Sequence, residues 1–266
     1  MKCFDIHVHI FPDKIAARTV EMLGSHAKIA PTYDGSRAGL VASMERAGLA
    51  GALNCPIATK KEQVVSINEW AAAQNRWPVL SLGTIHPDTP EPAAVLASLK
   101  ARGLPGIKLH PEYQQFTPDD PRLWPIGRAC RDLGLVLLLH AGEDIGFDPP
   151  YHSSPEGVRH LVEEHPGLKL VAAHFGGWRL WDEVDRRLVG QPVYLDVSFI
   201  FGMLPDARIV EMARRHGVER VVYGSDAPWR SQADDLRYFL SLPFTVEEQE
   251  RILWRNAAGL LGFDAG

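Results

Sequence analysis

The sequence predicts an α/β protein that folds as a (β/α)8 TIM barrel, with residues 1–266 forming a single domain. Short apolar runs alternate with longer amphipathic segments along the chain, which is typical of strand–helix units that build a parallel sheet. Eight such runs are present, and eight units fit a barrel of about 250 residues. Polar residues, chiefly histidine, follow several runs at the point where the predicted strand ends.

The predicted strands are short segments rich in aliphatic residues and bounded by polar or turn-forming residues. In chain order they are Cys3–Val8, Gly51–Asn54, Val79–Thr84, Gly106–Leu109, Leu135–Leu139, Lys169–Ala173, Val193–Val197 and Arg220–Tyr223.

Helix start signals lie between these strands. Ser36, Pro90, Pro121 and Pro155 each precede a segment whose apolar residues recur at helical spacing. At the end of the chain, Thr245–Leu261 predicts a closing helix whose apolar residues share roughly one face. We expect each of these helices to pack on the outside of the strands.

The composition favours a globular protein and argues against several functions. An apolar fraction of 45% suffices for a large core, and a net charge of -5 offers no basic surface for nucleic acid. Asp5 lies where a signal peptide would be apolar, and no apolar run could span a membrane. Cys3, Cys55 and Cys130 lack the spacing of a disulfide framework or thiolate metal site. We expect a cytoplasmic protein that binds neither nucleic acid nor membrane.

Three common sequence motifs are absent from the chain. There is no dinucleotide fingerprint, no phosphate-binding loop of the G-x-x-x-x-G-K-[ST] type and no G-x-S-x-G nucleophile elbow. The sequence therefore gives no support to three large classes of enzyme.

Histidines gather at the predicted strand ends. In a barrel the carboxyl ends of the strands face the active site, so a polar residue that ends a strand points toward a substrate. Six of the eleven histidines occupy such positions: His7, His9, His86, His110, His140 and His174. For His86 and His110, lining a pocket and packing beneath it remain alternatives. The other five are expected at the surface: His26, His152, His160, His165 and His216.

The arrangement of the strand-end residues predicts a metal site. His7 and His9 are two residues apart on one strand, so their side chains leave on the same face. His140 and His174 end neighbouring strands, and Asp226 follows the last strand, which lies beside the first in a closed barrel. Neutral imidazoles with a carboxylate suit a divalent ion such as Zn, Mn or Fe. Without a cation, such a cluster is difficult to explain in a barrel interior.

Aromatic residues and a glycine pair follow the strands. The aromatic side chains could line a pocket for a planar substrate or pack loops against the barrel; they are Tyr113, Trp178, Phe199, Phe201 and Trp229. Gly176 and Gly177 indicate a strained turn or a close approach of two backbone segments.

Five segments, taken in order, carry a family resemblance: Asp5–Pro12, Gly106–Pro111, Leu139–Gly142, Ala173–Gly177 and Gly224–Pro228. Together they resemble the amidohydrolase superfamily, specifically its amidohydrolase-2 branch, which includes the aminocarboxymuconate-semialdehyde decarboxylase-like enzymes. The resemblance spans nearly the whole chain. It implies a metal-dependent enzyme that acts on a small organic molecule.

The resemblance also implies roles for individual residues. In mononuclear members, the residues that correspond to His7, His9, His140 and Asp226 hold the ion, and the counterpart of His174 assists as acid or base. In binuclear relatives, a carboxylated lysine at the place of Lys108 bridges two metals, and the counterparts of His140 and His174 bind the second. Lys108 could instead be an ammonium that binds a substrate carboxylate. We expect one ion rather than two, with Zn as the first candidate.

The leading hypothesis is a metal-dependent hydrolase that cleaves a small amide, ester or lactone through a metal-activated water. Asp226 would take the proton of the water, and His174 would help to polarise the carbonyl group. The alternative is a non-oxidative decarboxylase of a small unsaturated or aromatic acid, with Lys108, Arg179 and Arg230 as available cations. A third hypothesis is a metal-containing barrel without catalysis.

Partners are expected to be small molecules. Besides Lys108, the substrate-binding candidates are His110, Trp178 and Arg230. Exposed helices on a barrel would also support a homodimer.

Overall fold

The computed structural model describes residues 1–264 of the chain. Its strands are all parallel and fall into two hydrogen-bonded sheets, in the orders β1-β2-β3 and β4-β5-β6-β7-β8-β9. The strands are β1 (Phe4–Val8), β2 (Gly51–Asn54), β3 (Val79–Ser81), β4 (Gly83–Thr84), β5 (Gly106–Leu109), β6 (Val136–Leu139), β7 (Lys169–Ala172), β8 (Tyr194–Asp196) and β9 (Val221–Val222).

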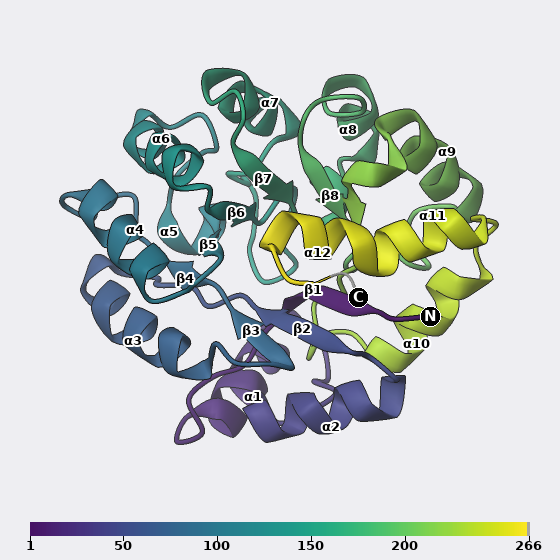
Figure 1. The fold of residues 1–266 in the computed structure, drawn as a ribbon, viewed down its shortest axis with the longest axis horizontal. Coiled ribbons are helices and arrows are strands. Elements are labelled where there is room, and N and C mark those ends of the chain that lie inside the picture. The colour runs from purple at the N-terminus through teal and green to yellow at the C-terminus, as the bar shows by residue number, and fades with distance from the viewer. Residues whose placement is uncertain (265–266) are drawn as a thin grey trace.

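The two sheets form one barrel. Leu82 alone separates β3 from β4, so the predicted strand Val79–Thr84 is a single barrel strand that passes from one sheet to the other. On the other side, the backbone N–H of Ile6 donates to the carbonyl of Tyr223 at 2.9 Å, and that of Asp226 donates to the carbonyl of His7 at 2.8 Å. These bonds join the end of the second sheet to β1. The strands occupy the centre of the molecule and the helices surround them (Figure 1). The predicted (β/α)8 barrel is confirmed.

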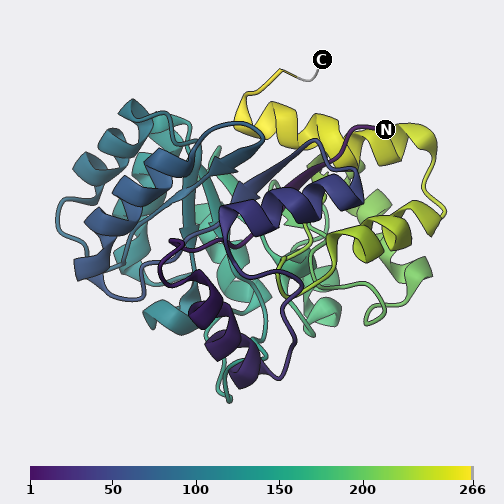
Figure 2. The ribbon, with the colours of Figure 1, turned by 90° about the horizontal axis from the view of Figure 1, so that it is seen from below.

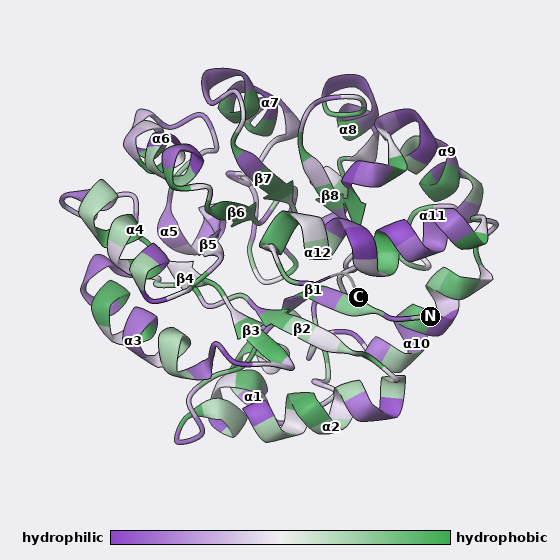
Figure 3. Cartoon of the chain, viewed as in Figure 1, coloured by the Kyte–Doolittle hydropathy of each residue, from purple (hydrophilic) through white to green (hydrophobic). Residues whose placement is uncertain are grey.

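Twelve α-helices are present in the described chain: α1 (Ala16–Ala27), α2 (Arg37–Ala47), α3 (Val64–Gln74), α4 (Pro92–Ala101), α5 (Pro111–Gln114), α6 (Trp124–Leu133), α7 (Pro155–Glu164), α8 (Trp181–Arg187), α9 (Asp206–His216), α10 (Gln232–Ser241), α11 (Val246–Glu250) and α12 (Asn256–Leu261). Polar residues predominate on the outer helices α7, α8 and α9, whereas β6, β7 and β8 are largely apolar (Figure 3). None of the helices in residues 1–264 has the length and apolar character needed to cross a membrane.

The start signals in the sequence correspond closely to the observed helix ends. Ser36 caps α2 by accepting a hydrogen bond from the backbone of Gly39 at 2.9 Å, and Pro155 is the first residue of α7. Pro121 opens a short 3-10 turn that leads into α6, whereas α4 begins two residues after Pro90. Fixed proline φ angles and side-chain caps favour a helix locally, which explains this agreement.

The C-terminal segment forms a helix with one π turn in its middle. Thr245 and Glu248 make a capping box at the start of α11, and a π turn over Arg251–Arg255 continues into α12. The carbonyl of Ile252 in this turn accepts a hydrogen bond from the backbone of Tyr223 at 3.0 Å. This segment lies at one end of the barrel, and α1 lies toward the opposite end (Figure 2).

Two of the histidines expected at the surface are buried instead. His216 donates from Nε2 to the carbonyl of Val193 at 2.8 Å, and its Nδ1 accepts from the backbone of Gly190 at 3.2 Å. His165 packs so closely on Gly127 that a Cβ at that glycine would lie 2.5 Å from the ring. The expectation was wrong for these two because helix ends that face the barrel place their last residues in the core.

Candidate active site

A cavity of about 660 Å³ opens at the carboxyl ends of the strands. It is lined by all but one of the predicted site residues: His7, His9, Lys108, His110, His140, His174, Trp178 and Asp226. Arg230 is the exception. Among the further candidates, Tyr113, Phe199 and Trp229 also line the cavity, whereas Phe201 packs against Tyr238 with the ring centres 5.2 Å apart. His110 therefore belongs to the pocket, and His86 does not line it.

His7, His9 and Asp226 form a compact group on the floor of the cavity. Asp226 Oδ1 lies 3.0 Å from His9 Nε2 and 3.4 Å from His7 Nε2. One ligand atom from each residue lies within 4.8 Å of the others, close enough for a single metal ion to contact all three. The period of two along β1 places both imidazoles on the same face, as predicted.

The protonation states of this group suit a divalent cation. Burial and the neighbouring Lys108 ammonium lower the pKa of His7 to about 3, so its imidazole is neutral at pH 7. Burial opposes ionisation of Asp226, but His7 and His9 outweigh it and hold the pKa of Asp226 below its usual range. Metal ions bind neutral imidazole and ionised carboxylate, so these residues fit a metal site.

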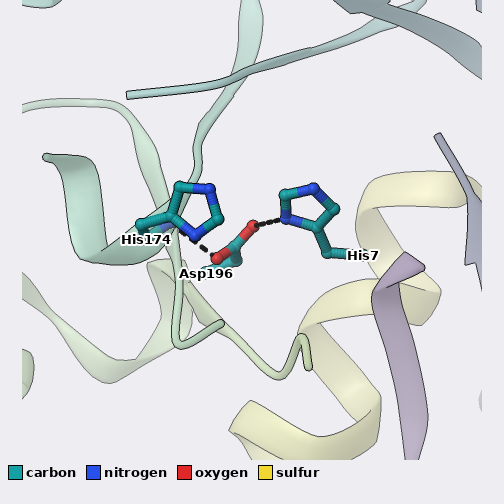
Figure 4. Close-up of side chains that lie close together, drawn as sticks. All are labelled: His7, His174 and Asp196. Carbon is teal, nitrogen blue, oxygen red and sulfur yellow. Dashed lines mark hydrogen bonds and ion pairs between the residues drawn. The ribbon is translucent and has the colours of Figure 1, made fainter. Parts of the chain in front are cut away.

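Asp196 orients His7. Its Oδ2 accepts a hydrogen bond from His7 Nδ1 at 2.9 Å, and its Oδ1 accepts one from the backbone of His174 at 2.9 Å. The carboxylate thus lies between His7 and His174 (Figure 4). Because the proton of His7 is held on Nδ1, the lone pair of Nε2 faces the cavity, as in other carboxylate–histidine–metal arrangements. The sequence analysis missed Asp196, although it ends a strand and the strand-end rule could have found it.

His140 belongs to a second group of donors on the cavity wall. Its Nδ1 lies 3.1 Å from His174 Nε2, and its ring stacks on that of His110 with the centres 4.1 Å apart. Asp144 Oδ2 lies 3.2 Å from His110 Nε2 and 3.8 Å from His140 Nε2. Within residues 1–264, His140 shares a compact donor group with His110 and Asp144 rather than with His9 and Asp226. It is connected to the floor of the cavity through His174. Asp144, in the loop after β6, is a second residue that the sequence analysis missed.

Lys108 lies at the centre of the cavity floor. It is 1% exposed, and its Nζ donates to His7 Nε2 at 3.0 Å. Burial lowers the pKa of Lys108, which increases the share of neutral amine. A neutral amine could react with CO2, and a charged one could bind a substrate carboxylate, so both alternatives for Lys108 suit this position.

The two candidate arginines interact with other side chains and do not reach the cavity lining. Arg230 forms two hydrogen bonds to the buried carboxylate of Asp235, at 2.6 and 3.1 Å. Arg179 lies over the ring of Trp178 at 4.2 Å and 3.6 Å from a carboxylate oxygen of Glu143. Neither arginine lines the cavity.

Strained backbone supports the loops around the site. Asp226, His174 and Phe199 have positive φ angles of 66°, 56° and 60°, a region that residues other than glycine rarely adopt. Gly176 has φ 83°, and a Cβ there would lie 2.9 Å from the side chain of Leu195. The strained turn predicted at the glycine pair is confirmed. Such strain occurs often at functional sites, where the surrounding structure compensates for it.

Comparison with known families and structures agrees with this geometry. A family model described as Amidohydrolase matches residues 4–263. No curated protein matches the sequence at a significant level.

Three solved structures illustrate the similarity in fold. An uncharacterised TIM-barrel protein from Bordetella bronchiseptica is 20% identical with a TM-score of 0.78, and the match covers 98% of this chain and 99% of that one. A protein from Pseudomonas putida, provisionally assigned as a 2-pyrone-4,6-dicarboxylic acid hydrolase, is 19% identical with a TM-score of 0.68 over 98% of each chain. The 5-carboxyvanillate decarboxylase of Novosphingobium aromaticivorans, solved with bound manganese, is 15% identical with a TM-score of 0.71 over 98% of this chain and 97% of that one.

These similarities span both chemical alternatives that the sequence left open. The family match covers nearly the whole described chain, and five strand-end histidines and Asp226 line one cavity. The chain therefore belongs to the amidohydrolase family of metal-dependent enzymes, which includes hydrolases and carboxy-lyases.

Proposed function

We propose that the protein is a metal-dependent hydrolase that cleaves a small amide, ester or lactone. The observation that supports this most strongly is the compact group that neutral His7 and ionised Asp226 form with His9 on the floor of a cavity. His7, His9, His140 and Asp226, which all line the cavity, would hold the ion. A bound divalent ion would polarise the scissile carbonyl and lower the pKa of a water molecule.

Asp226 is the general base of this proposal. Its depressed pKa keeps it ionised at neutral pH, so it accepts the proton of the attacking water. His9 Nε2 and Asp226 Oδ1 lie 3.0 Å apart and would both face the ion, which leaves Oδ2 as the oxygen that takes this proton. Asp226 then returns the proton to the leaving group.

His174 acts on the substrate oxygen. Ser198 Oγ lies 3.0 Å from His174 Nδ1 and holds the ring in place, while Nε2 faces His140 and the cavity. Because the Ser198 hydroxyl donates to Asp196 Oδ1, Ser198 Oγ accepts a hydrogen bond from His174 Nδ1. A second proton, on Nε2, makes the ring an imidazolium, which would donate to the oxygen on which negative charge develops. Such preorganised donors stabilise the transition state more than the ground state.

Decarboxylation of a small aromatic or unsaturated acid is the second candidate. The position of Lys108 favours it, because a substrate carboxylate could bind the ammonium 3.0 Å from His7. It ranks second because Arg179 and Arg230, which would clamp a further acidic group, do not line the cavity. His174 would then protonate the carbon that loses CO2. His110 and Trp178 are proposed to bind the substrate in either case.

The finer features of the proposal concern the ion and the assembly. We propose one ion per chain, with Zn as the first candidate and Mn or Fe as alternatives, and a cytoplasmic enzyme that forms a homodimer. The Lys108→Ala variant separates one ion from two, because a carboxylated lysine bridge would be lost with the side chain. Elemental analysis should find one equivalent before and after the change. Two equivalents that fall to one would establish the bridge instead.

The reaction is tested by incubating the metal-loaded protein with a panel of lactones, esters, amides and aromatic acids. We expect turnover of a lactone, ester or amide that is lost on chelation and restored by metal. Release of CO2 from an aromatic acid without hydrolysis would establish the second candidate. Full metal loading without turnover of any compound would favour the third hypothesis, a metal-containing barrel without catalysis.

A further inference from the structure

The cavity has two chemically different parts. Its floor holds the histidines, Lys108 and Asp226, as described above. Its outer part is largely apolar, with Ile15 and Leu23 near or on α1, Ile57 after β2, and Ile67 and Trp70 on α3. The neutral polar side chains on these same elements are those of Thr19, Thr59, Gln63 and Ser66. The sequence analysis did not identify α1, and α1 contributes much of this apolar wall.

The rim of the cavity exposes large apolar side chains to solvent. Ile15, Met22 and Ile145 are 50%, 60% and 44% exposed, and all three line the cavity. Exposed apolar side chains gathered at one opening gain free energy when a ligand covers them. Their position therefore favours a ligand whose apolar part extends from the floor to the rim.

The two walls of the outer part are connected. His26 on α1 lies with Nε2 2.7 Å from the carbonyl oxygen of Gly146, in the loop that follows β6. Both residues line the cavity, and Ile145 precedes Gly146. This contact holds α1 and the loop together, so the apolar part is a formed chamber rather than two separate surfaces.

Charge in the cavity is unfavourable for a second anionic group. Among the lining residues of the described chain, Lys108 is the only lysine or arginine, and it lies on the floor beside His7. The acidic residues of the lining are Glu143, Asp144 and Asp226. A carboxylate at the far end of a substrate would meet mainly apolar side chains and other carboxylates, with a few neutral hydroxyl and amide groups but no lysine or arginine to compensate its desolvation.

We propose that the substrate carries a single reacting polar group at one end and an extended apolar body, with no second acidic group. This inference rests on the proposed function and names the substrate class of that site. The reacting carbonyl or carboxyl group lies on the floor, and the apolar body fills the chamber as far as Ile15, Met22 and Ile145. Substrates with two carboxylates are disfavoured.

Matched lactones test the inference. One series carries linear alkyl substituents from methyl to hexyl, and the other carries chains of the same lengths that end in a carboxylate. We expect kcat/KM to rise about tenfold from methyl to hexyl, because part of each added methylene is buried. The carboxylate-ended compounds should be poorer by about tenfold or more at equal length, because the chamber offers no cation.

A binding measurement separates failure of this inference from failure of the proposed function. Alkyl cyclopentanones, which resemble the lactones and resist hydrolysis, are titrated into the protein by calorimetry with and without metal. We expect Kd to fall with alkyl length and to rise with a terminal carboxylate. Equal Kd values for the alkyl-ended and the carboxylate-ended ligands, or turnover that favours the carboxylate-ended lactones, would overturn the inference and leave the proposed hydrolysis intact. Absence of turnover in both series and with the ester and amide panel would contradict the proposed hydrolysis, and the Kd values would still show whether the chamber prefers an apolar or a carboxylate-ended ligand.

A rim variant gives a second readout. Met22→Lys places a cation at the opening without disturbing the floor, since Met22 is largely exposed. It should weaken the preference for hexyl over carboxylate-ended ligands by about fivefold. Val65→Lys on α3 is the matched control, because Val65 is 67% exposed and lies outside the lining. An equal effect of both variants, or none of Met22→Lys, would contradict the role of the rim.

Discussion

Replacing Asp196 by asparagine should weaken metal binding while the barrel stays folded. Three donors converge on Asp196 Oδ1, namely the backbone N–H groups of His174 and Ser198 and the hydroxyl of Ser198, at 2.9, 3.0 and 2.5 Å. The amide NH2 of asparagine cannot face three donors, so it must occupy the place of Oδ2. It then points at Nδ1 of His7, where the wild-type carboxylate accepts a proton.

The consequence is a change of tautomer. With an NH2 group opposite, His7 Nδ1 must accept a hydrogen bond, and the ring proton moves to Nε2. Nε2 then has no lone pair for a metal ion. Its N–H also faces Lys108 Nζ, a second donor that lies 3.0 Å from Nε2 in the wild-type structure. Loss of such an orienting carboxylate costs about 10- to 100-fold in metal affinity, or roughly 1.4 to 2.8 kcal/mol.

The assay is competition for Zn between the protein and a chromophoric chelator. Circular dichroism and the Tm of the metal-free variant report whether the fold is kept. Asp34→Asn, at the exposed turn before α2, is a control that changes the same charge outside the lining of the cavity. A metal affinity of Asp196→Asn equal to that of the wild type, with both proteins folded, would refute the tautomer argument.

Three further predictions concern the base, the barrel end and pH. Asp226→Asn should lower kcat by about a thousandfold or more with little change in Tm, because it removes the proposed base; near-normal turnover in a steady-state assay would contradict this role. Asn256→Ala should cost about 1 to 3 kcal/mol in urea unfolding, because Nδ2 donates to the carbonyls of Val218 and Val221, both at 2.7 Å; an unchanged midpoint would exclude this contribution. Burial lowers the pKa of His216 below 6.5, so as the pH falls the unfolded chain takes up a proton on this histidine before the folded protein does. The stability contributed by neutral His216 is therefore present above pH 6.5 and is lost as the pH falls below it. Unfolding followed from pH 8 to 5 should show a steeper loss in the wild type than in His216→Gln, and parallel curves would refute the assignment.

The architecture was predictable because its signals are local. The apolar runs gave all eight barrel positions, and Ser36 and Pro155 marked helix starts through caps and fixed φ angles that act within one turn. Helices without such signals were missed, and α1 is the most important of these, since its apolar face contributes to the cavity rather than to a regular layer on the barrel.

The site was predictable in part for a related reason. The period of two in β1 aligns His7 and His9, and barrel closure brings Asp226 to them, so sequence order alone indicated this group. The strand-end rule could have marked Asp196 as a candidate, but its role depends on a contact with His7, 189 positions away, which sequence order does not show. The same limit applies to Arg230, which is paired with Asp235 and does not line the cavity.

The sequence by itself determined the barrel, the strand ends that carry the chemistry and the family to which the chain belongs. Only the tertiary structure decided which nitrogen of His7 faces the cavity, that His140 contacts His174, and that the outer chamber is largely apolar, with no arginine among the lining residues in the described part of the chain. The physical reason is the separation along the chain of the residues that interact. Strand periodicity and helix caps act between near neighbours in the chain, whereas the direction of a ring or the charge of a cavity is set by side chains that meet only when the barrel closes.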